Sequence, residues 1–169
     1  SRDAKINNSL QLATMDAHTY VAQNLILTVP ERAENLQSFS TRIAEQLSAK
    51  IFKLHNPKII QVLGVGQDGH TAGIFPLPEE VFARTYNRRD LDIIPVAIEG
   101  LTIDSRASVT PNWILNQVDE LFGYIVGEGK KMILESLIQD SKPIHERPAE
   151  LLKLQSHSMV YTDQDIQAV

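Results

Sequence analysis

The stretch KIIQVL at residues 58–63, followed by GVGQDG at residues 64–69, decides the fold of this 169-residue chain. Its first part is short, apolar and rich in β-branched residues, and Gly64 closes it. This combination predicts a buried strand of a parallel sheet, because strands that are covered on both faces are almost continuously apolar. The second part follows at once, so we expect a strand-to-loop junction at Gly64.

The rest of the chain alternates between expected strands and expected helices. Further strands are expected at residues 93–98, 107–110, 121–126 and 159–162. Pro95 favours an edge position or a strand start for the first of them, since proline has no N–H to donate. Helices are expected at residues 9–28, from near Ser40 to before Pro57, and at residues 130–138. Such alternation is typical of βαβ units, so the fold class is α/β: a mainly parallel, Rossmann-like sheet with helices on both faces.

Length and composition predict one folded domain over residues 1–169. Apolar residues make up 43% of the chain and charged residues 22%, close to the average of soluble globular proteins. A chain of this length can bury a normal core. No linker rich in Gly or Ser separates two parts, and residues 76–92, with two prolines and three arginines, look like an excursion over the surface.

Charge and residue usage exclude several classes of function. The formal net charge is −5 and no run of Lys or Arg reaches four residues, so no nucleic-acid partner is expected. The absence of cysteine excludes thiol catalysis, disulfides and zinc-thiolate sites. No apolar run approaches the roughly 20 residues that cross a bilayer, so we expect a cytoplasmic protein without a membrane partner. Four of the five histidines show no spacing typical of metal ligands and are interpreted as structural or exposed, namely His18, His55, His145 and His157.

The glycine-rich segment has two ordinary interpretations. GVGQDG satisfies the pattern GxGxxG after a strand, as in dinucleotide-binding folds. Such a loop should open a long helix and be followed about 20 residues later by an acidic residue. Here Pro76 follows within seven residues, and Arg88 and Arg89 stand near the position of the acidic residue, so no nicotinamide cofactor is expected. The other interpretation is a tight turn that Asp68 caps, with His70 on the surface.

A longer string decides between these interpretations. LGVGQDGHTAGIFP at residues 63–76 closely resembles the signature of the 6-phosphogluconolactonases, and less closely that of their relatives, the glucosamine-6-phosphate deaminases. The deaminase loop carries a glutamate just before its final proline, where this chain has Phe75. Isomerisation of an amino sugar needs proton transfers that lactone hydrolysis does not require. The resemblance therefore implies hydrolysis of 6-phosphogluconolactone to 6-phosphogluconate, in the pentose phosphate pathway.

The resemblance also implies two phosphate-binding residues. RASVTP at residues 106–111 is similar to a family strand whose arginine binds the sugar phosphate, and GEGK at 127–130 to a turn whose lysine reaches it. Taken singly, Arg106 and Lys130 would be interpreted as surface cations, but both occur together with the histidine string. They are therefore the expected phosphate anchors, one a fork and the other a point charge. The implied partner is a small sugar-phosphate lactone, and the resemblance implies no metal and no cofactor.

The glycine-rich loop itself would supply the chemistry. His70 is the expected base for water, because imidazole can take up a proton near neutral pH. Asp68 either orients the imidazole and lines the pocket or serves as a turn or cap residue. The backbone N–H groups of Gly66 and Gly69 are expected to donate to the substrate or to a developing oxyanion.

The beginning of the family pattern has no counterpart in this sequence. Family members start with a strand, a Ser-Gly-Gly phosphate loop, a helix and a second strand, and nothing in residues 1–12 is similar to these. We therefore expect an N-terminally incomplete lactonase-like domain, either a fragment or a short homologue. This leaves open an inactive sugar-phosphate-binding homologue or fragment, and then a glucosamine-6-phosphate deaminase.

Overall fold

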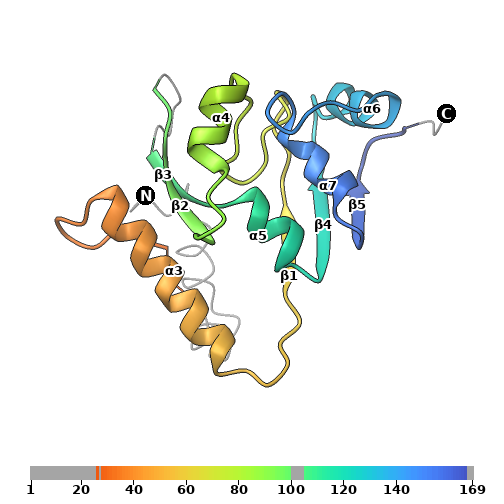
Figure 1. The fold of residues 1–169 in the computed structure, drawn as a ribbon. Helices are drawn as coiled ribbons and strands as arrows, with labels where there is room; N and C mark the ends of the chain where they lie inside the picture. The colour runs from red at the N-terminus through yellow and green to blue at the C-terminus, as the bar shows by residue number, and fades with distance from the viewer. Residues whose placement is uncertain (1–25, 27, 100–104, 167–169) are drawn as a thin grey trace. The chain divides into compact units, whose positions relative to one another are not determined.

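The computed structural model describes residue 26 and residues 28–99 and 105–166 (Figure 1). The chain divides into two compact units, one that ends at His55 and one from Asn56 to Val169. The helix expected at residues 9–28 lies almost entirely outside the described residues. The expectation of a single domain over residues 1–169 stays a prediction.

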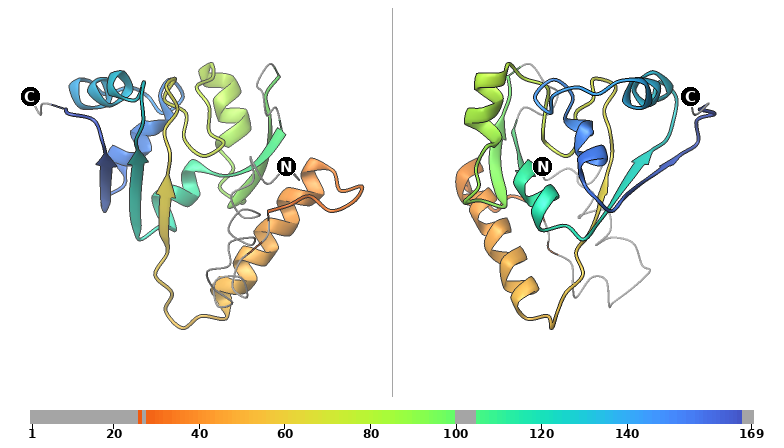
Figure 2. Two further views of the ribbon diagram at one scale, coloured as in Figure 1. Left: turned by 180° about the vertical axis from the view of Figure 1, so that it is seen from behind. Right: turned by 45° about the vertical axis from the view of Figure 1, so that its right-hand side comes forward.

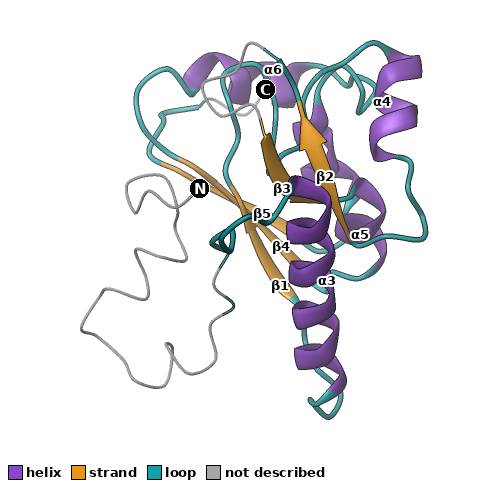
Figure 3. Cartoon of the chain, turned by 90° about the vertical axis from the view of Figure 1, so that its left-hand side faces the viewer, coloured by secondary structure: helices purple, strands orange, loops and turns teal. Residues whose placement is uncertain are grey.

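The described part of the first unit contains the helix α3 (Leu36–Phe52; Figure 3). Asn35 caps it, because its side-chain oxygen accepts a hydrogen bond from the N–H of Ser38 at 2.8 Å. The sequence predicted a start near Ser40, and this was wrong by about one helical turn. Ser40 lies inside the helix, and its hydroxyl donates to the carbonyl of Leu36 at 2.9 Å.

The second unit is built on a parallel sheet. Its strands are β1 (Ile60–Leu63), β4 (Glu120–Ile125) and β5 (Ser158–Thr162), which pair in the order β1-β4-β5. Figure 2 shows the three strands side by side. Both ladders are parallel. The predicted parallel pairing is therefore confirmed, and the expected bounds differ from the observed ones by no more than two residues.

One face of this sheet is covered by α7 (Leu151–Leu154). A Cβ added to Gly123 would lie 3.1 Å from a methyl group of Leu152, so glycine allows the helix to approach the central strand closely. Leu121 and Ile125, on the same face of β4, are fully buried.

The other face of the sheet is exposed. In β1, Leu63 is buried, whereas Ile60 is 54% exposed and Val62 is 64% exposed. The expectation of a fully buried first strand was therefore wrong, because alternate residues of β1 point to the face that α7 does not cover. Tyr124 in β4 and Tyr161 in β5 are exposed as well.

A second, antiparallel sheet pairs β2 (Ile93–Ala97) with β3 (Ser105–Val109). The sequence predicted strands at both places but not that they pair with each other. Pro95 lies opposite Ala107 in this ladder, which is tolerated because both strands of a two-stranded sheet are edge strands. After β3, Thr110 caps the short helix α5 (Pro111–Asn116).

Residues 76–92 form more than a surface excursion, which corrects the prediction for this segment. They contain α4 (Glu79–Tyr86), which begins after Pro78. Phe82 and Tyr86, four residues apart, are buried, and their ring centroids lie 4.7 Å apart. The arginines that suggested a loop are exposed, so this is an amphipathic helix with turns on either side.

Helices and their connecting segments lie between β4 and β5. α6 (Lys131–Gln139) buries Ile133, Leu134 and Leu137, as the apolar spacing predicted. The 3-10 helix η1 (Pro148–Glu150) then leads into α7. A parallel sheet with helices confirms the α/β fold class. No helix within the described ranges is both long enough and apolar enough to cross a membrane.

Candidate active site

β1 leads into the segment that carries the predicted chemistry, here called the histidine loop (residues 64–75). The N–H of Gly66 donates to the carbonyl of His70 at 2.8 Å, which folds the loop back on itself. The hydroxyl of the buried Thr71 donates to the carbonyl of Gly64 at 2.8 Å. The loop opens no long helix, because the next helix begins only at Glu79, and this agrees with the argument against a dinucleotide loop.

Asp68 and His70 form a hydrogen-bonded pair in this loop. Nδ1 of the imidazole lies 2.6 Å from Oδ1 of the carboxylate, and the backbone N–H of His70 donates to the same oxygen at 3.1 Å. Partial burial opposes ionisation of Asp68, but the two hydrogen bonds outweigh it and lower the pKa of this carboxyl. Asp68 therefore makes both contacts that the sequence left as alternatives: it orients the ring and it caps the turn.

These contacts determine which ring nitrogen carries the hydrogen when the imidazole is neutral. A carboxylate has no proton to donate, so Nδ1 of His70 carries the hydrogen and Nε2 of the neutral ring is a proton acceptor. The His70 side chain is 33% exposed, so the imidazole can be reached from solvent. The arrangement has the geometry of a base with an orienting carboxylate.

Gly66 and Gly69 shape the loop sterically. A Cβ on Gly66 would lie 2.5 Å from Oδ1 of Asp68 and would also overlap Nδ1 of His70. Gly69 has a φ of +83° and a Cβ there would lie 2.8 Å from Cγ of Arg147. The expected role of their N–H groups as donors to substrate is not supported, because these groups donate to carbonyls of the loop itself.

Arg106 approaches the histidine loop at Phe75. It lies on β3, and its guanidinium carbon is 4.8 Å from the centroid of the Phe75 ring. The imidazole of His70 packs on the same ring, with 4.8 Å between centroids and 30° between planes. Gly73 makes room for this, since a Cβ there would lie 2.9 Å from Cδ of Arg106. The expected base and one expected phosphate anchor thus meet at one aromatic ring.

Lys130 reaches the loop from the turn between β4 and α6. Its ammonium group donates to the carbonyl of Val65 at 2.5 Å. Gly127 and Gly129 allow this turn, with φ values of +98° and +80°. An ammonium has three N–H donors, so the bond to Val65 is compatible with a second acceptor. All six predicted residues therefore lie in the histidine loop or contact a residue of it.

Two polar residues outside the predicted set hold the C-terminal half of the loop. The hydroxyl of Tyr86 donates to the carbonyl of Gly73 at 2.9 Å and accepts from the N–H of Phe75 at 3.1 Å. Burial raises the pKa of Tyr86, so the hydroxyl stays neutral and can do both. The hydroxyl oxygen of Ser108 accepts from the N–H of Gly73 at 3.0 Å. No sequence pattern indicates these bonds, because they join residues that are distant in the sequence.

A third supporting residue, Arg147, lies against Gly69. Its side chain is 3% exposed, and its Nε donates to Glu150 at 2.6 Å. It also donates to the backbone carbonyls of Ser136 and Asp140, both at 3.0 Å. The spacing of Arg147 and Glu150 is a sequence signal for an ion pair, but nothing in the sequence indicates that the pair lies beside the histidine loop.

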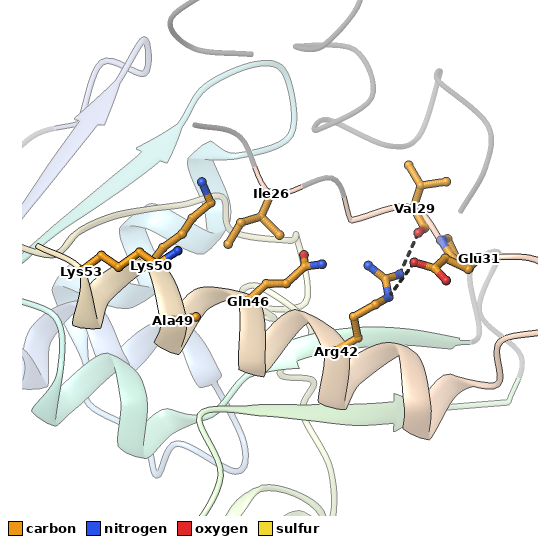
Figure 4. Close-up of a pocket in the computed structure, with 9 residues that line it drawn as sticks. Ile26, Val29, Glu31, Arg42, Gln46, Ala49, Lys50 and Lys53 are labelled. Carbon is orange, nitrogen blue, oxygen red and sulfur yellow. Dashed lines mark hydrogen bonds and ion pairs between the residues drawn. The ribbon is translucent and has the colours of Figure 1, made fainter. Parts of the chain in front are cut away.

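A cavity of about 680 Å³ in the first unit is lined by none of the predicted residues (Figure 4). Arg42 points toward Glu31 and the carbonyl of Val29, to which its guanidinium donates at 3.0 Å. Glu34 also pairs with Arg42 at 2.8 Å. This cation is thus neutralised within the unit. Among the described residues, no three His, Asp or Glu side chains gather closely enough to hold a metal ion.

Several solved structures share the fold. A Neisseria gonorrhoeae protein assigned as a 6-phosphogluconolactonase is 20% identical, with a TM-score of 0.59, over 90% of this chain and 64% of that one. A 6-phosphogluconolactonase from Shewanella baltica is 22% identical, with a TM-score of 0.56, over 76% of this chain and 53% of that one. A monomeric glucosamine-6-phosphate deaminase is 16% identical, with a TM-score of 0.56, over 78% of this chain and 54% of that one. The chain thus spans between half and two thirds of each of these proteins.

A match to a family profile identifies the family, and this match covers nearly the full length of the chain. No curated protein sequence matches the chain. The profile of the glucosamine-6-phosphate isomerases/6-phosphogluconolactonase family, however, matches residues 2–161. This range includes the histidine loop, Arg106 and Lys130. The chain therefore belongs to the glucosamine-6-phosphate isomerase/6-phosphogluconolactonase family.

Proposed function

We propose that the protein containing this chain hydrolyses 6-phosphogluconolactone to 6-phosphogluconate, with His70 as the general base. One observation carries the proposal: Nδ1 of His70 lies 2.6 Å from the Asp68 carboxylate, and this pairing directs the free lone pair of Nε2 away from the carboxylate. A neutral imidazole held in one tautomer is suited to remove a proton from water.

The reaction needs only water as a second reactant. Water attacks the carbonyl carbon of the lactone, and Nε2 of His70 takes one of its protons as the new C–O bond forms. The tetrahedral intermediate collapses, the bond from the carbonyl carbon to the ring oxygen breaks, and the imidazolium returns its proton to the ring oxygen. The carboxylic acid formed then loses its proton to solvent. The product is an open-chain carboxylate. Asp68 stabilises the imidazolium that exists between the two proton transfers.

The substrate's phosphate supplies most of the orientation. Arg106 offers a planar fork to phosphate oxygens, and Lys130 offers a point charge. Both cations contact the histidine loop, Arg106 at Phe75 and Lys130 at the carbonyl of Val65. A phosphate held by them would place the lactone near His70. This assignment of Arg106 and Lys130 rests on the family resemblance together with these contacts.

The direct test is hydrolysis of 6-phosphogluconolactone by the protein in its full natural length, against the spontaneous rate in buffer. We expect His70→Ala to lower kcat by about 10² to 10⁴ while KM changes little. Arg106→Ala should mainly raise KM, because a phosphate contact acts in both ground and transition states. Lys130→Ala should do the same more weakly. A folded protein no faster than buffer would show that the proposal is wrong.

A second candidate is a sugar-phosphate-binding protein without turnover. It is favoured by the histidine loop itself, since the N–H groups of Gly66 and Gly69 donate to loop carbonyls and therefore do not serve a developing oxyanion. Titration calorimetry with 6-phosphogluconate distinguishes it, because binding without hydrolysis supports it. Ammonia release from glucosamine 6-phosphate would instead indicate a deaminase, despite Phe75.

A further inference from the structure

Phe75 has an unusual set of neighbours for a core residue. Its side chain belongs to the buried core, with the residue 6% exposed. Yet its ring contacts two groups of the proposed site, the imidazole of His70 and the guanidinium of Arg106. The centroid of the imidazole and the guanidinium carbon each lie 4.8 Å from the ring centroid. These distances are typical of stacking and of cation–π contact.

The ring is itself held firmly in place. The N–H of Phe75 donates to the buried hydroxyl of Tyr86 at 3.1 Å, and that hydroxyl donates to the carbonyl of Gly73 at 2.9 Å. Tyr86 is at the end of α4, so the backbone on both sides of the loop's last turn is tied to a helix. The N–H of Gly73 is bound in turn by Ser108, on the strand that carries Arg106.

We propose that Phe75 is a positioning residue whose ring fixes the imidazole of His70 and the guanidinium of Arg106 at a constant spacing. The inference rests on the proposed function, in which these two groups act as the base and as a phosphate anchor. A flat, rigid surface restricts the rotamers of a long arginine side chain and the plane of an imidazole. Groups held in this way lose less freedom when substrate binds.

The side chain at residue 75 also affects the charges that surround Arg106 and His70. A carboxylate at residue 75 would lie within reach of both Arg106 and His70, and it would compete with a substrate phosphate for Arg106. An aromatic ring attracts the guanidinium through its face without neutralising it. Phe75 therefore contacts the guanidinium of Arg106 without adding a negative charge beside it.

The test compares two buried phenylalanines that differ in their neighbours. Phe75→Leu removes the ring that both His70 and Arg106 contact. Phe39→Leu is the matched control: Phe39 is also buried and the guanidinium of Arg42 lies 5.5 Å from its ring centroid, but it belongs to the first unit, which does not contain the histidine loop. We expect Phe75→Leu to lower kcat by about tenfold and to raise KM several-fold, as loss of a stacked cation predicts. Phe39→Leu should lower the melting temperature and leave kcat and KM within about twofold.

A second readout does not depend on turnover. In nuclear magnetic resonance spectra the imidazole C–H signals of His70 should be displaced by the ring current of Phe75. Phe75→Leu should remove this displacement and Phe39→Leu should not. If Phe75→Leu does not fold, Phe75→Met fills the same space without an aromatic face and serves in its place.

The outcomes separate this inference from the proposed function. Equal kinetic effects of the two substitutions, or His70 signals that Phe75→Leu leaves unmoved, overturn the positioning role. A wild-type protein that does not hydrolyse the lactone, but whose His70 signals respond to Phe75→Leu alone, supports the positioning role and removes the proposed function.

Discussion

Gly66 determines how closely the Asp68–His70 pair can lie over the backbone of the histidine loop. It has no positive φ, so its value is steric rather than conformational. The space that a Cβ would occupy is already filled by the Asp68 carboxylate and the His70 ring. Any larger residue must therefore displace the base.

We predict that Gly66→Ala lowers kcat by about 10²-fold, because a displacement of about 1 Å is enough for such a loss. The matched control is Gly64→Ala in the same loop, since a Cβ there would meet nothing within 4 Å. Steady-state kinetics of both variants, with circular dichroism to confirm folding, provide the measurement. A Gly66→Ala protein with normal kcat would mean that the imidazole position seen here is not the catalytic one.

At the scale of elements, the ends of helices in the second unit are tied together by a buried ion pair. Arg147 and Glu150 are both almost fully buried, and Arg147 also binds the carbonyl of Ser136 in α6. Removing Arg147 leaves the buried Glu150 with Lys153 as its remaining ionic partner and takes a donor from the carbonyls of Ser136 and Asp140, whereas a pair on the surface contributes little. The buried pair therefore joins α6 to η1 and α7 and supports Gly69 beside them.

We predict that Arg147→Met lowers the free energy of unfolding by about 3 kcal/mol. Lys58→Met, which breaks the exposed pair with Glu120, should cost only a small fraction of this. Urea denaturation of the two variants gives the comparison. Equal losses would contradict the assignment of Arg147 as the buried support of the loop.

In the first unit, Arg42 of α3 ties the helix to the chain before it through Glu34. The hydrogen bond from Arg42 lowers the pKa of Glu34 from its ordinary 4.5 to about 2. Because the folded pKa is the lower one, the contact stabilises the unit fully above pH 4.5, and this stabilisation is lost as the pH falls through 2.

We predict that the Glu34 carboxyl titrates near pH 2 in carbon-13 spectra and returns toward pH 4.5 in Arg42→Met. A Glu34 that titrates at its ordinary value in the unaltered protein would show that the pair does not form in solution. Arg88→Met serves as the control, because it removes a different arginine, which pairs with Asp90.

Local patterns predicted the parallel strands and α6, because their apolar residues are consecutive or lie at helical spacing. They did not predict α4, since Pro76, Pro78 and the arginines indicated a loop. The buried pair Phe82 and Tyr86, at i and i+4, was the available signal. The pairing of β2 with β3 depends on contacts between distant residues and has no local signature. For the same reason the sequence indicated His70 and Arg106 but not that both contact the ring of Phe75.

At the scale of the whole molecule, the uncovered face of the β1-β4-β5 sheet is an exposed apolar surface. Exposed alternate side chains share it, namely Ile60, Val62, Tyr124, Met159 and Tyr161. Phe122 lies between them, with its ring centroid 5.9 Å from that of Tyr161. Single exposed apolar residues are normal, but a contiguous patch favours association with another surface.

We predict that this chain on its own associates as its concentration rises, and that Val62→Lys together with Tyr124→Lys suppresses the association. Both side chains are more than half exposed, so the lysines stay in water and the melting temperature should hardly change. Met132→Lys is the control, because Met132 is 81% exposed but lies on α6 rather than on the sheet. Sedimentation velocity over a concentration series measures the effect. Met132→Lys should associate as the unaltered chain does. If the double variant does so as well, contacts other than the sheet face cause the association, and the prediction is wrong.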